Sequence, residues 1–382
     1  MKDLSILLLS LILIYSCKKE VAPNQNAETL GNFITYTLHS GTPDNSMIHT
    51  SDDNILICGN YNHEIILLKL DKEGNEIWQK DSLYTKDSGG YGLAEMDNGD
   101  IVICGHTSDS DPLVDEDILL IKTNSFGDTL WTRTYGGEGN ERGVNIIACS
   151  DGNILVSSKS TSSELDDIHL IKISGNGDLI WDNYYSTSDN EVPYSLIETS
   201  DGDYLITCNS VYSINGFPFI NPYFLKVNSS GNVLWENKLE SDQNRHAYST
   251  IELSNGDLLS CGDFLDGTST QNYLVRTNSL GEILWEKNSG PIVDMDKLYA
   301  LKENNDGSFV AVGENTNPNW ETDLTTLNFD GDGNEIWYKK YGGAIGETGY
   351  NILIDINGDI IISGNVGGSL FITKLDKNGN FK

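Results

Sequence analysis

Tyrosine recurs at one place in a repeated sequence pattern, where several copies could surround a single ligand. It lies eight residues before a turn glycine in five repeats, at Tyr91, Tyr194, Tyr248, Tyr299 and Tyr350. Two other repeats have Val144 and Ser46 in that place. Aromatic rings around a channel could stack on a ligand, but buried aromatic side chains more often serve packing. We therefore expect these tyrosines to pack at the edges of their sheets, with a ligand-binding ring as the alternative.

Two charged columns accompany the tyrosines. Four residues after the tyrosine position lie Glu95, Glu198, Glu252 and Glu303, whereas other repeats have Ala148, Ile354 and Thr50. A carboxylate ring could hold Ca²⁺, which takes six to eight oxygen ligands, but the uncharged substitutions favour solvated strand ends. The basic column comprises Lys69, Lys122, Lys172, Lys226, Arg276 and Lys374, with Asn328 in one repeat. We expect these cations to pair with neighbouring acids, and an anion-binding ring is the alternative.

Aromatic residues also interrupt the repeat pattern in loops, where binding residues commonly lie. The candidate ligand-binding residues are Tyr212, Phe217 and Phe219 in one loop, Phe264 in the next and Trp320 in a third. Exposed aromatics on adjacent loops suit sugar stacking or a protein contact, unless the loops pack on themselves. Another loop could bind a cation or a basic partner through Asp109, Asp111, Asp115, Glu116 and Asp117.

The usual catalytic and metal-binding motifs are absent from the sequence. It contains no HExxH, no GxSxG, no CxxC and no pair of adjacent cysteines. We therefore predict no metal site, no cofactor and no catalytic residue, and we favour a protein that is not an enzyme. The 57 acidic and 24 basic residues give a net charge of −33, which argues against nucleic-acid binding.

The N-terminal residues resemble a bacterial lipoprotein signal. An apolar run from Leu4 to Ile14 is too short to span a bilayer and ends at Tyr15-Ser16-Cys17. The resemblance implies that residues 1–16 are removed and that Cys17 is lipidated, while residues 17–30 form a flexible tether. An ordinary secretory signal with an incidental cysteine is the alternative.

The rest of the chain consists of repeats of about fifty residues. Tryptophan recurs in steps of 50 to 54 residues, at Trp78, Trp131, Trp181, Trp235, Trp285 and Trp337. An Asx-Gly hairpin signal recurs as well, replaced by Asp53-Asn54 in the first repeat. Each repeat contains four short strand patterns, two of them continuously apolar, which is typical of propeller blades. Single cysteines in five successive repeats are too far apart to bridge, so we expect buried free thiols at Cys58, Cys104, Cys149, Cys208 and Cys261.

The two ends of the repeat region complement each other. The last repeat stops where its fourth strand would begin, and Gly31 to Tyr36 match that missing strand. Pairing the two would remove both exposed sheet edges. The sequence therefore predicts an all-β, seven-bladed β-propeller of four-stranded blades over residues 31–382, closed by an N-terminal strand that completes the last blade.

The segments Leu70–Trp78 and Phe329–Trp337 resemble the tryptophan-docking motif of quinoprotein-type propellers. Together with Tyr135-Gly136-Gly137 and Tyr341-Gly342-Gly343, they resemble the quinoprotein-like repeat lipoproteins of Gram-negative envelopes. The resemblance implies that each Trp of the repeat docks one blade on the next, a structural role, although Thr35 replaces Trp in one repeat.

We therefore expect a non-catalytic, monomeric propeller, lipid-anchored in the outer membrane and facing either the periplasm or the cell surface. Its partner would be a polysaccharide or an envelope protein, bound through the loop face. The alternatives are an envelope enzyme, such as a glycan hydrolase or lyase, and a scaffold for outer-membrane assembly.

Overall fold

The computed structural model describes residues 34–36, 46–61, 63–84, 87–108, 116–137, 139–161, 165–214, 216–267, 269–289, 294–343 and 346–382. The predicted signal peptide, Cys17 and the tether lie outside these residues, as do Asp109, Asp111 and Asp115. Every regular element in the described part is a β-strand, and no helix there is long and apolar enough to cross a membrane.

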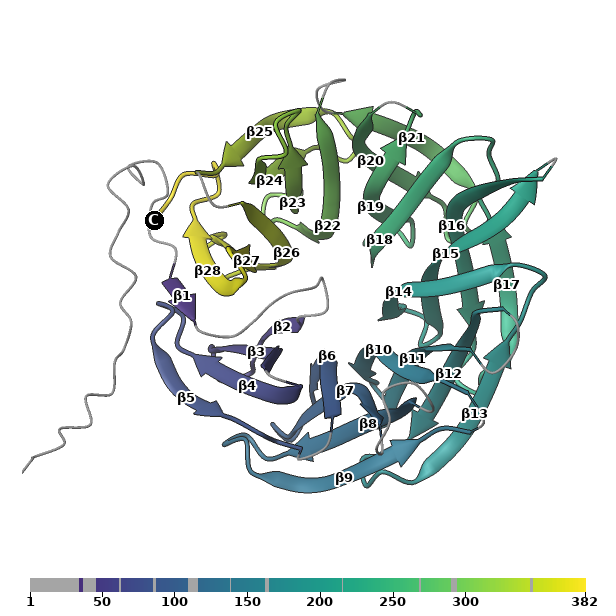
Figure 1. Cartoon of the computed structure of the whole chain (residues 1–382), viewed down its shortest axis with the longest axis vertical. Coiled ribbons are helices and arrows are strands. Elements are labelled where there is room, and N and C mark those ends of the chain that lie inside the picture. Colours follow the sequence, from purple (N-terminus) through teal and green to yellow (C-terminus); the bar gives the residue numbers. More distant parts are fainter. Residues whose placement is uncertain are drawn as a thin grey trace, which may run out of the picture.

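The strands form a β-propeller, in which sheets stand around a central opening like the sectors of a ring (Figure 1). Four sheets follow the chain order, and their strands are β2 (Ser46–His49), β3 (Ile55–Tyr61), β4 (Glu64–Leu70) and β5 (Glu76–Lys80); β6 (Asp87–Glu95), β7 (Ile101–Ser108), β8 (Glu116–Thr123) and β9 (Thr129–Tyr135); β10 (Glu141–Ala148), β11 (Ile154–Ser160), β12 (Asp167–Ile173) and β13 (Leu179–Tyr185); and β14 (Asn190–Glu198), β15 (Tyr204–Ile214), β16 (Phe217–Val227) and β17 (Val233–Lys238).

The remaining strands form one eight-stranded and one four-stranded sheet. The larger sheet contains β18 (Asn244–Glu252), β19 (Leu258–Leu265), β20 (Thr270–Thr277), β21 (Ile283–Ser289), β22 (Met295–Glu303), β23 (Phe309–Thr316), β24 (Thr322–Phe329) and β25 (Glu335–Tyr341). The last sheet contains β26 (Glu347–Ile354), β27 (Ile360–Val366), β28 (Ser369–Leu375) and β1 (Ile34–Tyr36).

The prediction of seven four-stranded blades is therefore wrong. The structure has five four-stranded blades, and β18 to β25 belong to a single eight-stranded sheet. The cause is a parallel pairing of Thr270 on β20 with Met295 on β22, beside the antiparallel pairing of β20 with β21. Repeat length predicts four strands per repeat but carries no information about a bridge between two repeats.

Strand β1 joins the two ends of the chain. Its residues Ile34, Thr35 and Tyr36 pair antiparallel with Ile372, Phe371 and Leu370 of β28. Figure 1 shows the purple β1 beside the yellow β28, and β2 lies next to β26. The expected N-terminal strand is thus the outermost strand of the last sheet, so that β28 has a partner on both sides.

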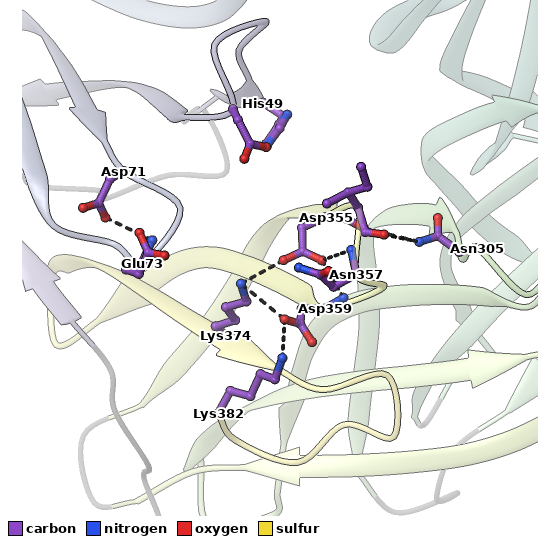
Figure 2. A network of polar contacts seen from close by, with 11 residues as sticks. His49, Asp71, Glu73, Asn305, Asp355, Asn357, Asp359, Lys374 and Lys382 are labelled. Atoms are coloured by element: carbon purple, nitrogen blue, oxygen red, sulfur yellow. Dashed lines mark hydrogen bonds and ion pairs between the residues drawn. The ribbon is translucent and has the colours of Figure 1, made fainter.

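Charged side chains gather where the last sheet meets its neighbours. The Lys374 ammonium lies 2.8 Å from Asp355 and 3.3 Å from Asp359, and Lys382 lies 2.5 Å from Asp359. Figure 2 shows this cluster with Asn305 of the eight-stranded sheet on one side and His49 of the first sheet nearby. The amide of Asn305 donates to the Ile356 carbonyl at 3.4 Å, which links the two sheets.

The basic column forms ion pairs, as expected. Lys69 lies 2.6 Å from Asp52, Lys172 lies 2.6 Å from Asp151, and Lys226 lies 2.5 Å from Asp201. Each acid lies in the turn between the first two strands of the same sheet, so the pair holds that turn against the third strand. The same arrangement recurs at Lys122–Asp100, Arg276–Asp257 and Lys374–Asp355.

The tryptophans lie between neighbouring repeats. Gly127, in the turn between β8 and β9, has φ of +78°, and a Cβ there would lie 3.0 Å from the ring of Trp78 on β5. The same contact joins Trp131 to Gly177, Trp181 to Gly231, Trp235 to Gly281, Trp285 to Gly333 and Trp337 to Gly379. The indole N–H of Trp181 also donates to the Ser229 carbonyl at 3.1 Å. Each ring therefore covers a turn of the next repeat that only a glycine fits without strain.

The five described cysteines are free and buried, which confirms that prediction.

Candidate functional site

The innermost strands carry a β-bulge that places one extra residue on the side of the central opening. In β6, Gly90 pairs with Gly105 and Gly92 pairs with Cys104, so Tyr91 between them has no partner in the ladder. The same register shift leaves out Val144, Tyr194, Tyr248, Tyr299 and Tyr350. A bulge bends its strand and redirects the side chain of the extra residue. The tyrosine column of the sequence is therefore the column of bulged residues.

These tyrosines line a cavity of about 450 Å³ at the centre of the propeller. Its lining includes all five of them, together with Ser46, Asn145, Ser195, Ser249 and Asn351. The tyrosines thus pack on one another at the inner edges of their sheets, as expected, and they also occupy the position around a channel that the ligand-binding alternative requires. No residue that lines this cavity in the described part of the chain is Asp, Glu, His, Lys, Arg or Cys.

The structure shifts the alignment of the first repeat with the other repeats by one residue. Ser46 pairs with Cys58 as Gly92 pairs with Cys104, so Ser46 corresponds to the residue after the tyrosine. The residue at the tyrosine position itself, 45, lies outside the described residues. The turn shows the same shift, because Asp53 has φ of +63° and takes the place of the turn glycine. His49, not Thr50, therefore corresponds to the glutamate column.

Four of the tyrosines form a continuous arc around one side of the cavity. The ring centroids of Tyr194 and Tyr248 lie 5.1 Å apart, those of Tyr248 and Tyr299 5.5 Å, and those of Tyr299 and Tyr350 5.3 Å. These separations are typical of interacting aromatic pairs. The fifth, Tyr91, stacks on His106 with centroids 5.3 Å apart. The cavity wall is thus aromatic along an arc of four strands, β14, β18, β22 and β26.

Two carboxylates lie behind this arc and orient its rings. The Tyr248 hydroxyl donates to Asp263 at 2.6 Å, and the Tyr299 hydroxyl donates to Glu314 at 2.9 Å. Burial raises the pKa of both tyrosines far above the usual range, and the neighbouring carboxylates raise it further. Both hydroxyls therefore stay protonated and act as donors towards the acids.

The glutamate column has a structural role that neither sequence interpretation anticipated. Glu95 accepts hydrogen bonds from the Ser51 backbone N–H at 2.6 Å and from the Ser51 hydroxyl at 3.0 Å. Glu198 binds Ser150 and Glu252 binds Ser200 in the same way. Each glutamate thus clamps a turn of the preceding repeat. In the part of the chain that is described, no group of three or more His, Cys, Asp or Glu side chains could hold a metal ion.

The loop aromatics named from the sequence do not form one surface. Phe217 and Trp320 are 68% and 79% exposed, but β18 to β21 separate their hairpins in the ring. Phe264 is buried against the core, and Phe219 is half-buried. Tyr212 is buried as well, and its hydroxyl donates to the Ser241 carbonyl at 2.9 Å while it accepts from Asn221 at 2.9 Å. In the loop that was expected to bind a cation or a basic partner, Glu116 forms an ion pair with Arg142.

No protein-family model and no curated protein matches the chain. Several solved structures share its fold. A structure of YCF48 bound to D1 peptide is 12% identical, with a TM-score of 0.51 over 89% of this chain and 94% of that one. The α-L-arabinanase of Penicillium chrysogenum complexed with arabinobiose is 13% identical, with a TM-score of 0.50 over 78% of this chain and 98% of that one. Puromycin hydrolase is 9% identical, with a TM-score of 0.57 over 94% of this chain but 56% of that one. At these identities the similarity concerns the fold alone, and the chain is a β-propeller built from sequence repeats.

Proposed function

We propose that this protein is a non-catalytic binding propeller that holds a sugar unit of a glycan in its central cavity. The observation that carries the proposal is the arc of four tyrosines from Tyr194 to Tyr350 in a cavity of about 450 Å³. Ligand pockets commonly have volumes of about 300–1,000 Å³.

The lining matches the two kinds of surface that a sugar ring presents. The C–H face of a sugar packs on an aromatic ring, and Tyr248 and Tyr299 are held by their hydroxyl groups with their rings on the cavity. Sugar hydroxyls need hydrogen-bond donors and acceptors, which Ser195, Ser249 and Asn351 can supply. The lining therefore supports a glycan in preference to a purely apolar ligand.

The same lining supports binding without reaction. Glycoside hydrolysis ordinarily uses two carboxyl groups that flank the scissile bond. Asp263 and Glu314 instead lie behind tyrosine hydroxyls, and their side chains are 4% and 17% exposed. The predicted lipid anchor at Cys17 completes the proposal, since it would hold this cavity at the outer membrane, next to envelope polysaccharides.

Glycan arrays, followed by calorimetry with any bound oligosaccharide, test the proposal on the mature chain. We expect Tyr248→Ala and Tyr299→Ala to weaken binding at least tenfold, because each removes a stacking surface. Trp320→Ala is the matched control, since it removes an exposed aromatic that does not line the cavity, and it should leave affinity unchanged. Loss of binding in Trp320→Ala but not in Tyr248→Ala would refute the cavity as the site. Shortened oligosaccharide products after incubation would refute the non-catalytic role.

A further inference from the structure

We propose that the central cavity selects glycan units that carry a free ammonium group, as in a deacetylated amino sugar. This inference rests on the proposed function and names the ligand class of the same cavity. Its basis is the combination of an aromatic arc with buried carboxylates immediately behind it.

Each of the two carboxylates behind the arc has a single basic neighbour among the described residues. Asp263, which is 4% exposed, is approached by Tyr248 and by His246, whose ring nitrogen lies 3.0 Å away. Glu314 accepts from the hydroxyl of Thr348 at 2.9 Å. Its cation is Lys297 at 3.5 Å, and this lysine is 36% exposed, so solvent weakens the pair. His246 carries a charge only when it is protonated, and Lys297 is partly exposed, so neither acid has a buried cation of fixed charge beside it in the described part of the chain.

The tyrosines transmit this negative charge to the cavity. A hydrogen bond from a phenol to a carboxylate increases the electron density of the ring. The face of such a ring attracts a cation that lies within about 6 Å of its centroid. Because Tyr194, Tyr248, Tyr299 and Tyr350 are neighbours, an ammonium group beside the arc can contact more than one ring.

The net charge of the whole molecule also favours a positively charged ligand. The chain has a net charge of −33, and a narrow cavity with protein walls concentrates the field of the surrounding charges. No lysine or arginine is among the residues that line the cavity in the described part of the chain. An anionic sugar would therefore be repelled, and a cationic one would be attracted.

An amino sugar fits better than the lysine side chain of a basic peptide. The lining contains Asn145, Ser195, Ser249 and Asn351, which can bind several hydroxyl groups around one ring. A lysine side chain has an alkyl stem and would leave these groups without partners. The sugar satisfies both the polar lining and the aromatic arc.

Two tetrasaccharides that differ only in charge provide the test: the β-1,4-glucosamine tetramer and its fully N-acetylated form. Calorimetry with the mature chain, at low ionic strength and a pH at which the amines are protonated, should show at least tenfold tighter binding of the glucosamine tetramer. The preference should shrink at high salt because exposed charges are screened. Asp263→Asn and Glu314→Gln should each reduce the preference at least threefold.

Asp332→Asn is the matched control, because it removes one negative charge from an exposed turn distant from the cavity. If it reduces the preference as much as Asp263→Asn, the net charge and not the cavity determines selectivity, and the inference is overturned.

Tyr248→Phe provides a second variant that keeps the ring and removes the bond to Asp263, so a reduced preference in this variant supports the argument even if Asp263→Asn unfolds. Equal binding of both tetramers overturns the inference while leaving the proposed function intact, whereas binding of neither tetramer or any other glycan refutes both. Binding of tetralysine as tight as that of the glucosamine tetramer also overturns the inference, since it points to a basic peptide.

Discussion

The substitution Gly127→Ala, which places a methyl group under the Trp78 ring, tests how strongly one repeat docks on the next. Gly127 has φ of +78°, and a Cβ there would lie 3.0 Å from two carbons of the Trp78 ring and 2.7 Å from Lys80. Gly99 lies in the same sheet with φ of +80°, and a Cβ there would meet nothing within 4 Å. An alanine at either position therefore has the same backbone strain, and only the alanine at position 127 also meets the side chains of Trp78 and Lys80.

The expected magnitudes follow from these two costs. Left-handed backbone costs an alanine about 1–2 kcal/mol, and both variants should lose that amount of unfolding free energy. Carbon atoms pack best at about 3.5–4.0 Å, so a carbon at 3.0 Å from a rigid indole must push the repeats apart. Overpacking of this kind costs about 1–3 kcal/mol. Gly127→Ala should thus be about 1–3 kcal/mol less stable than Gly99→Ala.

Urea unfolding, monitored by circular dichroism and compared at a shared m-value, measures the difference. A second comparison in a Trp78→Leu background removes the indole, so the difference between Gly127→Ala and Gly99→Ala should shrink, and the remainder belongs to the contact with Lys80, 2.7 Å from the added Cβ. The coupling between Trp78 and Gly127 in this cycle should be about 1–3 kcal/mol. Equal destabilisation of the two glycine variants in the unmodified chain would refute the docking argument.

Other perturbations test the anchor, the buried charges and the closing strand. Cys17→Ala should abolish fatty-acid labelling and release the protein from the membrane fraction, and labelling that persists would contradict lipidation at this residue. The pKa values of Asp52 and Asp201 are about 2: burial raises them, but the hydrogen bonds and charge of the paired lysine, together with hydrogen bonds from neighbouring groups of the turn, lower them by more. Since these values lie below the ordinary 3.8, the stabilisation is present above about pH 4 and is lost as the pH falls towards 2. Both acids are about half-exposed, so we expect about 0.2–1 kcal/mol from each, seen as an acid loss of urea resistance that Asp52→Asn makes shallower. Deletion of residues 31–38 should lower the urea midpoint and expose β28 to proteases, and an unchanged midpoint would show that β1 contributes nothing to closure.

The repeated side chains made much of the fold predictable. The regular Trp spacing and the turn glycines indicate a repeat of four strands. The two columns keep a constant spacing because an indole such as Trp78 needs a glycine such as Gly127 beneath it. The bridge from Thr270 to Met295 could not be predicted, since it involves one residue pair and no sequence pattern. The sequence pattern aligns the first repeat one residue out of register with the others, because Asp53 adopts a backbone conformation that is usually taken by glycine.

The candidate site was predictable only in part. The tyrosine column is plain in the sequence, but its direction depends on the bulge at each inner strand, which a spacing pattern does not reveal. The loop aromatics illustrate the opposite error. Tyr212 lies in an insertion that should be exposed, yet Asn221 and Ser241 supply partners for its hydroxyl and bury it. Departure from a repeat therefore indicates variation, not exposure.

The clamps formed by Glu95, Glu198 and Glu252 imply that the ring is not equally strong all the way round. Ala148 on β10 and His49 on β2 take the place of the glutamate, and neither side chain is a carboxylate that could bind the preceding turn, whereas at β26, where Ile354 replaces the glutamate, Asn305 links the two sheets instead. A force that pulls the ring open, or a slow opening fluctuation, should begin at those junctions. The propeller would then separate first beside β10 or β2.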